Sequence, residues 1–545
     1  MRAVRPYPQE LIERYRSIWL GITLVEAFER TCDIIPAKEA VVDGEKRISF
    51  VQLREKVHSA AKVFLKLGLA GGSPVLLQVP NSIEAIYIYL GLIMIGVTPV
   101  LCLPRHGQRE LERFASLTNA TAWIGVLNQG KINYINMVKA VQKKNPSLKR
   151  IIVVENDGRP DSISLTDLME EHTTSPDIET DLREYCPSPD DLLHLAPTGG
   201  TTGLPKLVPR THNSHLCKAY YWARAAERSF VDIDLVVAPI NHDAPQLGHL
   251  AFMALFGGTL VLCPSPKASV IVDFLEKENI TFSFMVPTLL SDLAKEPDVE
   301  QRRFSPELKL AYGGAWAPAD LIRNIRRRFR CRFYSIYGMT EGLGTITRST
   351  DATDVVAGTT GKAMCPYDDY RVVDDEENDL PIGVEGEFVA QGPCIISGYY
   401  KSEEDRKAFT RNGFLKTGDL GKFDVDGNTI VTGRKKDLIK RGAETIIPFE
   451  IEEIISRHPK VLQVAVVGMP DERLGEKICA YIQNLPGEII TIEEINSFLV
   501  ERGASKMLLP ERIEILDEFP VTTMQKIDKQ ALREDIARKI KTEER

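Results

Sequence analysis

The chain has 545 residues, a net charge of −8 and an isoelectric point near 5.8, with 43% hydrophobic and 26% charged residues. This length exceeds what one hydrophobic core supports, so we expect several domains in an otherwise ordinary globular protein. The acidic balance argues against a nucleic-acid-binding protein that relies on overall charge, because such proteins are normally basic.

The N-terminal stretch and the cysteines bear on the cellular compartment. The first residues, MRAVRPYPQELIERYRSIWL, carry charges and prolines but no apolar segment, so they do not resemble a signal peptide. No CxxC pair occurs, and a dispersed, odd-numbered set is typical of reduced thiols rather than a disulfide framework or a zinc site. We therefore expect a cytoplasmic protein with nine unpaired cysteines, namely Cys32, Cys102, Cys186, Cys217, Cys263, Cys331, Cys365, Cys394 and Cys479.

Strand-like apolar runs alternate with helical stretches up to about residue 290. Continuous Val, Ile and Leu runs separated by helices predict a parallel sheet that is buried on both faces. Residues 85–104 are apolar enough to imitate a membrane span, but Gly96 and Pro99 interrupt them. A buried helix leading into a buried strand is therefore predicted there, and no membrane span. The predicted strands lie within 73–80, 98–104, 149–156, 234–240, 258–265 and 281–287.

The pattern changes from about Gly358, where short apolar runs are separated by Asp, Asn and Gly turns. Such spacing predicts antiparallel sheet. A last unit of alternating helices and strands begins near Arg434, and its charged tail, 531–545, is predicted to be a solvated helix. We predict an α/β protein with a large N-terminal domain, 1–433, of parallel-rich α/β subdomains plus an antiparallel β subdomain, and a small α+β C-terminal domain, 434–545.

The stretch LAPTGGTTGLPKLVPRTH, 195–212, contains a loop rich in glycine and threonine after a strand-like run. Glycine lets backbone N–H groups approach an anion, threonine hydroxyls add donors, and Lys206 adds a positive charge. Lys206 stands three residues after Gly203 and follows a proline, which disfavours a P-loop kinase or NTPase. Taken alone, the loop fits a phosphate site and a flexible surface turn equally well.

Four further motifs follow in order, each unremarkable alone: YSIYGMTEG (334–342), LKTGDLGKFD (415–424), VTGRKKDLIKRGAETI (431–446) and FPVTTMQKIDKQAL (519–532). Together with the glycine-threonine loop they resemble the signature set of the adenylate-forming superfamily: acyl-CoA synthetases, amino-acid adenylation domains and luciferases. The resemblance covers nearly the whole chain, and five separated motifs agree.

Within that superfamily the chain looks most like the stand-alone aryl-acid–AMP ligases, such as 2,3-dihydroxybenzoate–AMP ligase. The stretches that carry this narrower likeness are GVTPVLCLPRHGQRELERFA, LPKLVPRTHN, GTLVLCPSPKAS, GTTGKAMCPYDDYRVVDDEENDL and SGYYKSEEDRKAFTRNGFLKTGD.

The resemblance implies an ATP-dependent enzyme that activates a carboxylic acid. A carboxylate is a poor electrophile, and its attack on the α-phosphate of ATP gives an acyl-AMP with release of pyrophosphate. Catalysis then consists mostly of positioning and charge neutralisation. A phosphopantetheine thiol, from coenzyme A or a carrier protein supplied in trans, would accept the acyl group. Mg²⁺ is the implied metal cofactor.

The resemblance also assigns phosphate-binding residues. Glu341 would bind Mg²⁺, a hard cation suited to carboxylate oxygen, and Thr340 would hydrogen-bond a phosphate oxygen. Lys206 equally fits a mobile surface lysine. The residues expected to hold the β- and γ-phosphates are Thr198, Gly199, Thr201, Thr202, Gly203 and Lys206.

For the nucleoside, Tyr337 would pack beside adenine, next to Gly338, although an apolar strand end also fits plain core. Asp419 would accept hydrogen bonds from both ribose hydroxyls, with help from Arg434. The opposite wall of the adenine site would be Gly313, Gly314 and Ala315 of YGGAW.

The small C-terminal domain would be mobile in this family and would bring Lys526 to the α-phosphate and the attacking carboxylate. The family usually has glycine before this lysine, whereas this chain has Gln525, which bears on the geometry of the loop. Lys436 stands at the position of the family hinge, and equally fits a solvated charge. The Gly442 region would face the adenylate when the thiol attacks.

The carboxylate pocket is expected at APINHDAPQLGHLAF, 238–252, with Gly314. His242 matches a family position close to the reacting acid. Asp243 stands where the dihydroxybenzoate ligases have asparagine. An ionised aspartate accepts hydrogen bonds but cannot donate them, which favours an ortho N–H or O–H, or a cationic amine. Alternatively, Asp243 caps the following helix.

The sequence therefore predicts an aryl-acid ligase for a hydroxy- or aminobenzoate. The alternatives are an enzyme that adenylates an amino acid or β-amino acid, and a fatty-acid or other acyl-CoA synthetase. A non-catalytic adenylate-binding relative is disfavoured because Glu341, Asp419, Arg434 and Lys526 are all present.

Overall fold

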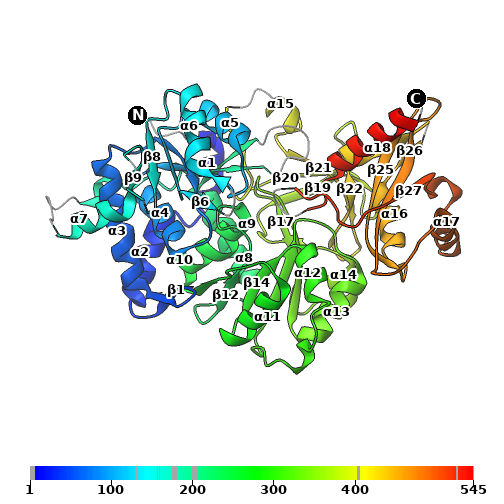
Figure 1. Cartoon of the computed structure of the whole chain (residues 1–545), viewed down its shortest axis with the longest axis horizontal. Coiled ribbons are helices and arrows are strands. Elements are labelled where there is room, and N and C mark those ends of the chain that lie inside the picture. The colour runs from blue at the N-terminus through cyan, green and yellow to red at the C-terminus, as the bar shows by residue number, and fades with distance from the viewer. Residues whose placement is uncertain are drawn as a thin grey trace.

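A computed structural model of the chain describes residues 6–129, 132–155, 157–158, 160–174, 181–198, 206–401, 405–442, 444–522 and 526–543. The first 430 or so residues form two large sheets with helices between and outside them, followed by a small antiparallel sheet (Figure 1). A separate sheet at the C-terminal end lies at the right of Figure 1 with α16, α17 and α18.

The first large sheet has the strand order β11-β10-β4-β3-β5-β8-β9. Its pairs are parallel except β10 with β11, and its central strands are buried along their length. The predicted parallel sheet is thus confirmed. The strands are β3 (Pro74–Gln78), β4 (Thr98–Leu101), β5 (Ala122–Gly125), β8 (Arg150–Val153), β9 (Ile163–Ser164), β10 (Leu192–Pro197) and β11 (Leu207–Thr211), and β6 (Asn128–Gln129) and β7 (Ile132–Asn133) form a separate hairpin.

The second large sheet has the order β18-β17-β16-β15-β14-β12-β13-β1-β2 and is parallel from β16 to β1. Its strands are β1 (Glu39–Asp43), β2 (Lys46–Ser49), β12 (Ile233–Val236), β13 (Thr259–Leu262), β14 (Phe282–Met285), β15 (Lys309–Gly313), β16 (Arg332–Gly338), β17 (Gly344–Ile346) and β18 (Lys362–Ala363).

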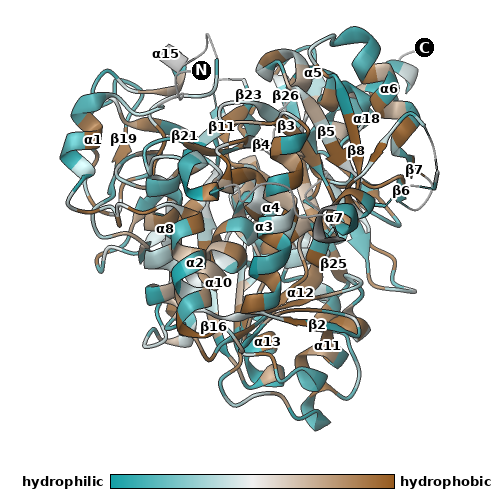
Figure 2. Ribbon diagram, turned by 90° about the vertical axis from the view of Figure 1, so that its left-hand side faces the viewer, coloured by the Kyte–Doolittle hydropathy of each residue, from teal (hydrophilic) through white to brown (hydrophobic). Residues whose placement is uncertain are grey.

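Helices form a shared layer between the two sheets and cover both outer faces, so the largest apolar core lies in the middle. Figure 2 shows mostly brown strands behind helices that carry teal, outward faces. The shared layer includes α2 (Leu24–Ile34), α3 (Phe50–Lys66), α4 (Ile83–Met94), α8 (His212–Ala225) and α10 (Phe252–Phe256). The outer helices are α5 (Gln108–Thr118) and α6 (Tyr134–Lys144) on the first sheet, and α11 (Ala268–Lys277), α12 (Pro287–Leu293), α13 (Ala319–Phe329) and α14 (Thr353–Gly358) on the second. Further helices are α1 (Gln9–Tyr15), α7 (Leu165–Thr174) and α15 (Asp405–Ala408).

Helix α4 explains the apolar stretch that imitates a membrane span. All but one of its residues are buried, and it packs so closely on α3 that a Cβ on Gly91 would lie 3.2 Å from Cβ of Ala60. The chain then turns at Gly96 into β4, as predicted. Within the described part of the chain, no helix combines the length and apolar character needed to cross a bilayer.

The antiparallel prediction for the region after Gly358 is confirmed by a four-stranded sheet, β19 (Asp369–Val373), β20 (Gly386–Gln391), β21 (Leu415–Phe423) and β22 (Thr429–Arg434). A short 3₁₀ turn, η4 (Lys435–Asp437), follows. The C-terminal unit contains β23 (Ile439–Arg441), β24 (Glu444–Ile446), α16 (Pro448–Ile455), β25 (Val461–Asp471), β26 (Gly475–Asn484), α17 (Ile492–Glu501), β27 (Arg512–Ile515) and α18 (Lys529–Glu543).

The prediction for the charged tail needs correction. Helix α18 is not merely solvated, because Leu532 and Ile536 are buried and pack on Val467 and Tyr481 of the C-terminal sheet. Two apolar positions four residues apart suffice to dock one face of a helix, although the rest of the helix is charged.

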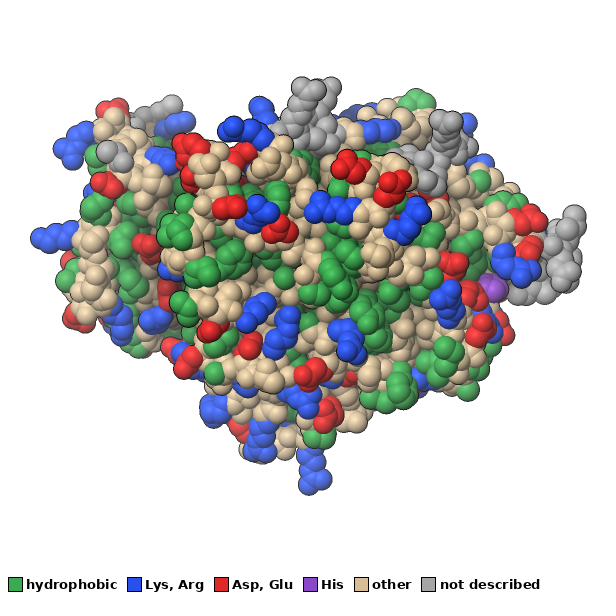
Figure 3. Space-filling view, turned by 180° about the vertical axis from the view of Figure 1, so that it is seen from behind, with side chains coloured by type: hydrophobic (Ala, Val, Ile, Leu, Met, Phe, Trp, Pro, Cys, Tyr) green, Lys and Arg blue, Asp and Glu red, His purple; other side chains and the backbone are tan. Residues whose placement is uncertain are grey.

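Acidic and basic side chains are interspersed over the face of the molecule drawn in Figure 3, in keeping with the modest net charge.

Candidate active site

Three strands bring the predicted nucleoside residues together. Tyr337, near the end of β16, donates a hydrogen bond from Oη to Oδ2 of Asp419 at 2.7 Å. Arg434, at the end of β22, places Nε 2.7 Å from Oδ1 of the same carboxylate. Asp419 is buried, and burial together with this carboxylate raises the pKa of the Tyr337 phenol. Each carboxylate oxygen is thus fixed by one neighbour, which defines the direction in which Asp419 can accept further hydrogen bonds.

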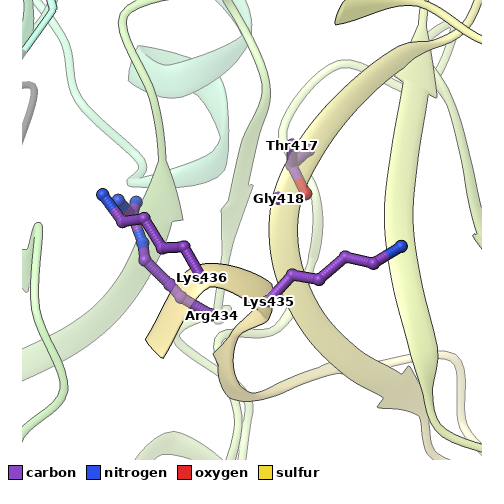
Figure 4. Close-up of a pocket in the computed structure, with 5 residues that line it drawn as sticks. All are labelled: Thr417, Gly418, Arg434, Lys435 and Lys436. Carbon is purple, nitrogen blue, oxygen red and sulfur yellow. The ribbon is translucent and has the colours of Figure 1, made fainter. Parts of the chain in front are cut away.

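Beside this group lies a pocket of about 410 Å³ lined by Thr417, Gly418, Arg434, Lys435 and Lys436 (Figure 4). Arg434 and Lys436 extend to the same side in Figure 4, whereas Lys435 points the opposite way. Lys435 is held there by Asp375, at 2.7 Å, and Glu387, at 3.1 Å. The end of β22 and the η4 turn therefore direct two of three consecutive cations, Arg434 and Lys436, toward one side.

Lys526 lies against Gly314. A Cβ on Gly314 would be 3.2 Å from Cε and 3.5 Å from Nζ of the lysine, and Gly314 has a φ of +90°. Lys526 is held beside Thr522, because its N–H donates to Oγ1 of Thr522 at 3.3 Å and its carbonyl accepts from the Thr522 N–H at 2.8 Å. Glycine at 314 has no Cβ to block the lysine, and it readily adopts the positive φ of this position.

Burial and nearby Arg434 lower the pKa of Lys526 to about 8. Asp419 opposes this shift, while Lys436 adds to it. Lys526 and the η4 turn therefore converge on one electropositive region next to the nucleoside residues.

The two ends of the glycine-threonine loop meet at its neck. Thr198 N–H donates to the Lys206 carbonyl at 2.9 Å, and Lys206 N–H donates to Thr198 Oγ1 at 3.1 Å. Lys206 Nζ lies 4.7 Å from the ring centroid of Tyr399. The predicted residues between them, Gly199, Thr201, Thr202 and Gly203, lie outside the described residues, as does Gln525.

Glu341 is joined to this group through Tyr399, whose Oη donates to Oε1 of the carboxylate at 2.7 Å. The Glu341 side chain is buried, which raises its pKa. The following Gly342 has a φ of +114°, and a Cβ there would lie 2.0 Å from the carbonyl oxygen of Cys394. A buried carboxylate on a rigid turn offers the hard oxygen ligands that Mg²⁺ prefers, so Glu341 fits the implied metal. Thr340 lies in the same turn and is partly exposed.

The carboxylate-pocket stretch follows β12 and enters a helix, as predicted. Helix α9 (Asp243–Pro245) begins at Asp243, and the capping residue is His242, whose Nδ1 accepts from the Ala244 N–H at 3.3 Å. The alternative in which Asp243 caps the helix is therefore wrong. Burial, with Lys526 as the next cause, lowers the pKa of His242 to about 3, so this imidazole is neutral at physiological pH.

Asp243 points into a buried polar cluster that the sequence did not predict. Ligand atoms of Asp243, His194 and His215 lie within 4.8 Å of one another, and all three residues are buried. Among the described residues, Asp243 Oδ1, His194 Nε2 and both ring nitrogens of His215 have no hydrogen-bond partner. Tyr89 Oη holds the other nitrogen of His194 at 2.8 Å. Burial raises the pKa of Asp243 and lowers those of both histidines.

The helix continues from α9 through a π-helical turn, Gln246–Ala251, before α10. Such turns are frequent at functional sites because they shift the positions of side chains along the helix. Gly248 lies in this turn, and a Cβ there would be 2.7 Å from the Trp222 ring. Close contact with α8 thus fixes the position of the helix that is predicted to form the floor of the carboxylate pocket.

Comparison with known proteins identifies the family. A family model for AMP-binding enzymes matches residues 28–400, and a model for the AMP-binding enzyme C-terminal domain matches residues 450–526. The chain belongs to the AMP-binding enzyme family. It is an ATP-dependent carboxylate–AMP ligase.

The relatives of this AMP-binding enzyme match it over nearly its whole length. A 2,3-dihydroxybenzoate-AMP ligase of Bacillus subtilis is 33% identical over 99% of both chains. A salicyl-AMP ligase / salicyl-S-ArCP synthetase of Mycobacterium tuberculosis is 33% identical over 97% of this chain and 93% of its own. The crystal structure of ATP-bound MatB from Rhodopseudomonas palustris covers 95% of this chain and 99% of its own, with a TM-score of 0.84 and 25% identity.

Two sequence-predicted positions of the AMP-binding enzyme lie at the junction to the C-terminal unit. Lys436 is exposed in η4, where the four-stranded sheet ends and the C-terminal sheet begins. Gly442 follows β23 with a φ of +65°, and its N–H donates to the Leu474 carbonyl at 2.7 Å. Trp316 of the large domain meets Phe449 of α16 edge-on, with ring centroids 5.2 Å apart. The hinge and thiol-side roles stay predictions.

We expect the activity to fall at alkaline pH because the Lys526 ammonium is lost above a pKa of about 8. The ratio kcat/KM for ATP reports ionisations of the free enzyme, so it should decline along a limb with that pKa. Pyrophosphate release measured from about pH 6 to pH 10 gives the profile. In a Lys526→Arg variant, which stays charged over this range, the limb should move to higher pH. An identical alkaline limb in both proteins contradicts the assignment to Lys526.

Proposed function

We propose that this enzyme adenylates an aryl acid with a hydrogen-bond donor in the ortho position, a hydroxy- or aminobenzoate, and passes the acyl group to a phosphopantetheine thiol. The observation that carries the proposal is Oδ1 of Asp243, which is buried at the start of α9 and has no hydrogen-bond partner among the residues that the structure describes. A buried acceptor without a donor costs free energy, so a substrate N–H or O–H at this point gains a strong, partly charged hydrogen bond.

The relatives support the class of acid. The Bacillus subtilis enzyme is named for 2,3-dihydroxybenzoate and the Mycobacterium tuberculosis enzyme for salicylate, and both acids carry an ortho hydroxyl. The latter is also named a salicyl-S-ArCP synthetase, which supports a thiol acceptor. Coenzyme A and a carrier protein present the same thiol arm.

The proposed chemistry brings two anions together. The Asp419 carboxylate, oriented by Tyr337 and Arg434, would accept hydrogen bonds from the ribose hydroxyls. Gly314 would border both adenine and the acid, with Lys526 lying across it. The Lys526 ammonium would then neutralise charge on the α-phosphate and on the attacking carboxylate oxygen as the phosphorus–oxygen bond to pyrophosphate breaks.

The phosphate end of the site would use residues of both described loop ends. Thr198 and Lys206 would bind the β- and γ-phosphates together with Thr201 and Thr202, and Thr340 would donate to a phosphate oxygen. Mg²⁺ held by Glu341 would neutralise phosphate charge when bound. His242, which is neutral because of its low pKa, would contact the acid without adding a competing charge.

ATP–pyrophosphate exchange with benzoate, salicylate, anthranilate and a β-amino acid tests the proposal. We expect salicylate or anthranilate to exceed benzoate in kcat/KM by about tenfold or more, the value of one hydrogen bond to a charged group. A preference for benzoate contradicts the ortho-donor assignment, and a preference for the β-amino acid indicates that Asp243 binds an ammonium group instead. Adding coenzyme A to the preferred reaction then shows whether the free cofactor accepts the acyl group.

A further inference from the structure

Three of the nine cysteines meet at one point in the interior. Cys217 belongs to α8, Cys365 follows β18, and Cys394 follows β20. Their sulfur atoms all lie within 4.8 Å of one another, and none of the three side chains is more than 1% exposed. The three cysteines are far apart in the sequence and form no CxxC pair, so their spacing does not predict this cluster.

The backbone around the cluster is held firmly. Asp368 Oδ1 accepts from the Cys394 N–H at 3.1 Å, and the Asp368 N–H donates to the Cys365 carbonyl at 3.2 Å. One aspartate therefore joins two of the three cysteine loops. Tyr7 Oη donates to the Ile395 carbonyl at 2.5 Å, and Trp19 Nε1 donates to the Pro393 carbonyl at 2.9 Å, so the N-terminal segment closes the site from outside.

Two buried cations stand beside the cluster. Arg210 Nη1 donates to the Cys394 carbonyl at 2.9 Å, and Lys218 directly follows Cys217 in α8. Within the described part of the chain, both side chains donate hydrogen bonds to backbone carbonyls: Arg210 also to Ser214, and Lys218 to Met339 and Leu343. A buried cation is stabilised by nearby negative charge, so this environment favours ionised over neutral sulfur.

We propose that Cys217, Cys365 and Cys394 form a structural zinc site, a proposal that does not depend on the identity of the acid. Thiolates are the ligands that Zn²⁺ prefers in structural sites, and a Zn–S bond of about 2.3 Å places two sulfurs of a tetrahedron about 3.8 Å apart. The sulfur atoms lie within 4.8 Å of one another, so any pair would need to approach by no more than about 1 Å to reach this spacing. Asp368 is not among the ligand atoms that lie within 4.8 Å of one another, so its carboxylate would have to turn toward the sulfurs, or a water molecule would have to enter, to complete the tetrahedron.

The site would stabilise the wall behind Glu341. The Ile396 N–H, two residues after Cys394, donates to the Glu341 carbonyl at 2.9 Å. Gly342 packs directly on the Cys394 carbonyl. Fixing Cys394 therefore fixes the turn that presents the Glu341 carboxylate. Three thiolates and one dication carry a net charge of −1, which either of the two buried cations, Arg210 or Lys218, is sufficient to offset.

The test is the metal content of the full-length protein purified under reducing conditions. We expect about one zinc ion per chain by elemental analysis, the content of a single site. Replacement with Co²⁺ should give the sulfur-to-cobalt charge-transfer absorption of thiolate ligands. Cys365→Ser should lose at least about tenfold in zinc affinity, since loss of a ligand costs more than loss of its outer partners. Cys331→Ser, which removes a buried cysteine outside the cluster, should retain the metal.

Two results overturn the proposal. One is a zinc-free and cobalt-silent wild-type chain, purified from zinc-supplemented cultures, in which mass spectrometry finds all three thiols free. The other is a disulfide between any two of these cysteines in the purified protein. Because the cobalt spectrum is measured on the unaltered chain, the answer does not depend on whether Cys365→Ser folds. Neither result bears on the acid-panel experiment, so the two proposals fail independently.

Discussion

Replacing Lys526 with alanine is expected to lower acyl-adenylate formation by about 10²–10³-fold, the loss found when one preorganised donor is removed from a transition state. Lys526 lies across Gly314 with its ammonium beside Arg434 and Lys436, so its charge is already in place before the acid attacks. In a buried site this charge is worth more than in water, because the surroundings screen it poorly. Steady-state pyrophosphate release measures the loss.

A matched control separates the charge of Lys526 from general damage to the C-terminal unit. Lys529, three residues later, pairs with Glu452 at 2.6 Å on the C-terminal unit itself. Lys529→Ala should keep near wild-type adenylation. Thermal unfolding of both variants measures the damage to the fold, and Lys529→Ala should lose more stability because it leaves the buried Glu452 carboxylate without its ammonium partner. A Lys526→Ala enzyme with a near wild-type rate of pyrophosphate release would rule out the proposed role.

The contact between Lys526 and Gly314 also shows what the sequence can and cannot predict. The motifs predict that both residues serve one nucleotide, because they match a family pattern at separate places in the chain. The sequence does not predict that Gly314 is needed for the lysine to lie there, since this follows from a φ of +90° and a 3.2 Å approach. Tyr399 was likewise only one tyrosine in a family-like stretch, yet it connects Lys206 with Glu341.

The fold was more predictable than the site because its main signal is local. Continuous apolar runs such as 73–80 and 258–265 become β3 and β13, since a strand buried on both faces needs apolar residues throughout. The buried cluster of His194, His215 and Asp243 has no such local signal. Its members come from β10, α8 and α9, and only the packing of α8 between the two sheets brings them together. The same helix carries Cys217 to the other two cysteines.

Replacing Asp243 with asparagine is expected to change the choice of acid more than the rate with benzoate. Asparagine keeps the size of the side chain and one acceptor oxygen, but it loses the charge and gains a donor. The hydrogen bond to a substrate amine or hydroxyl should weaken, because a neutral acceptor contributes less binding free energy than a charged one. We expect kcat/KM for the preferred ortho-substituted acid to fall by about 5–15-fold, whereas benzoate should change by less than about threefold.

The measurement is ATP–pyrophosphate exchange with both acids, expressed as the ratio of their kcat/KM values. Asp426→Asn, which makes the same chemical change in an exposed turn, should leave this ratio unaltered.

The pH dependence of this ratio is an independent test of the charge on Asp243. Burial raises the pKa of Asp243, so lowering the pH protonates it and should reduce the wild-type preference, while the preference of the asparagine variant should stay constant. If Asp243→Asn keeps the wild-type ratio at neutral pH, the carboxylate does not contact the substrate, and its negative charge serves only the buried Arg210 and Lys218 beside it.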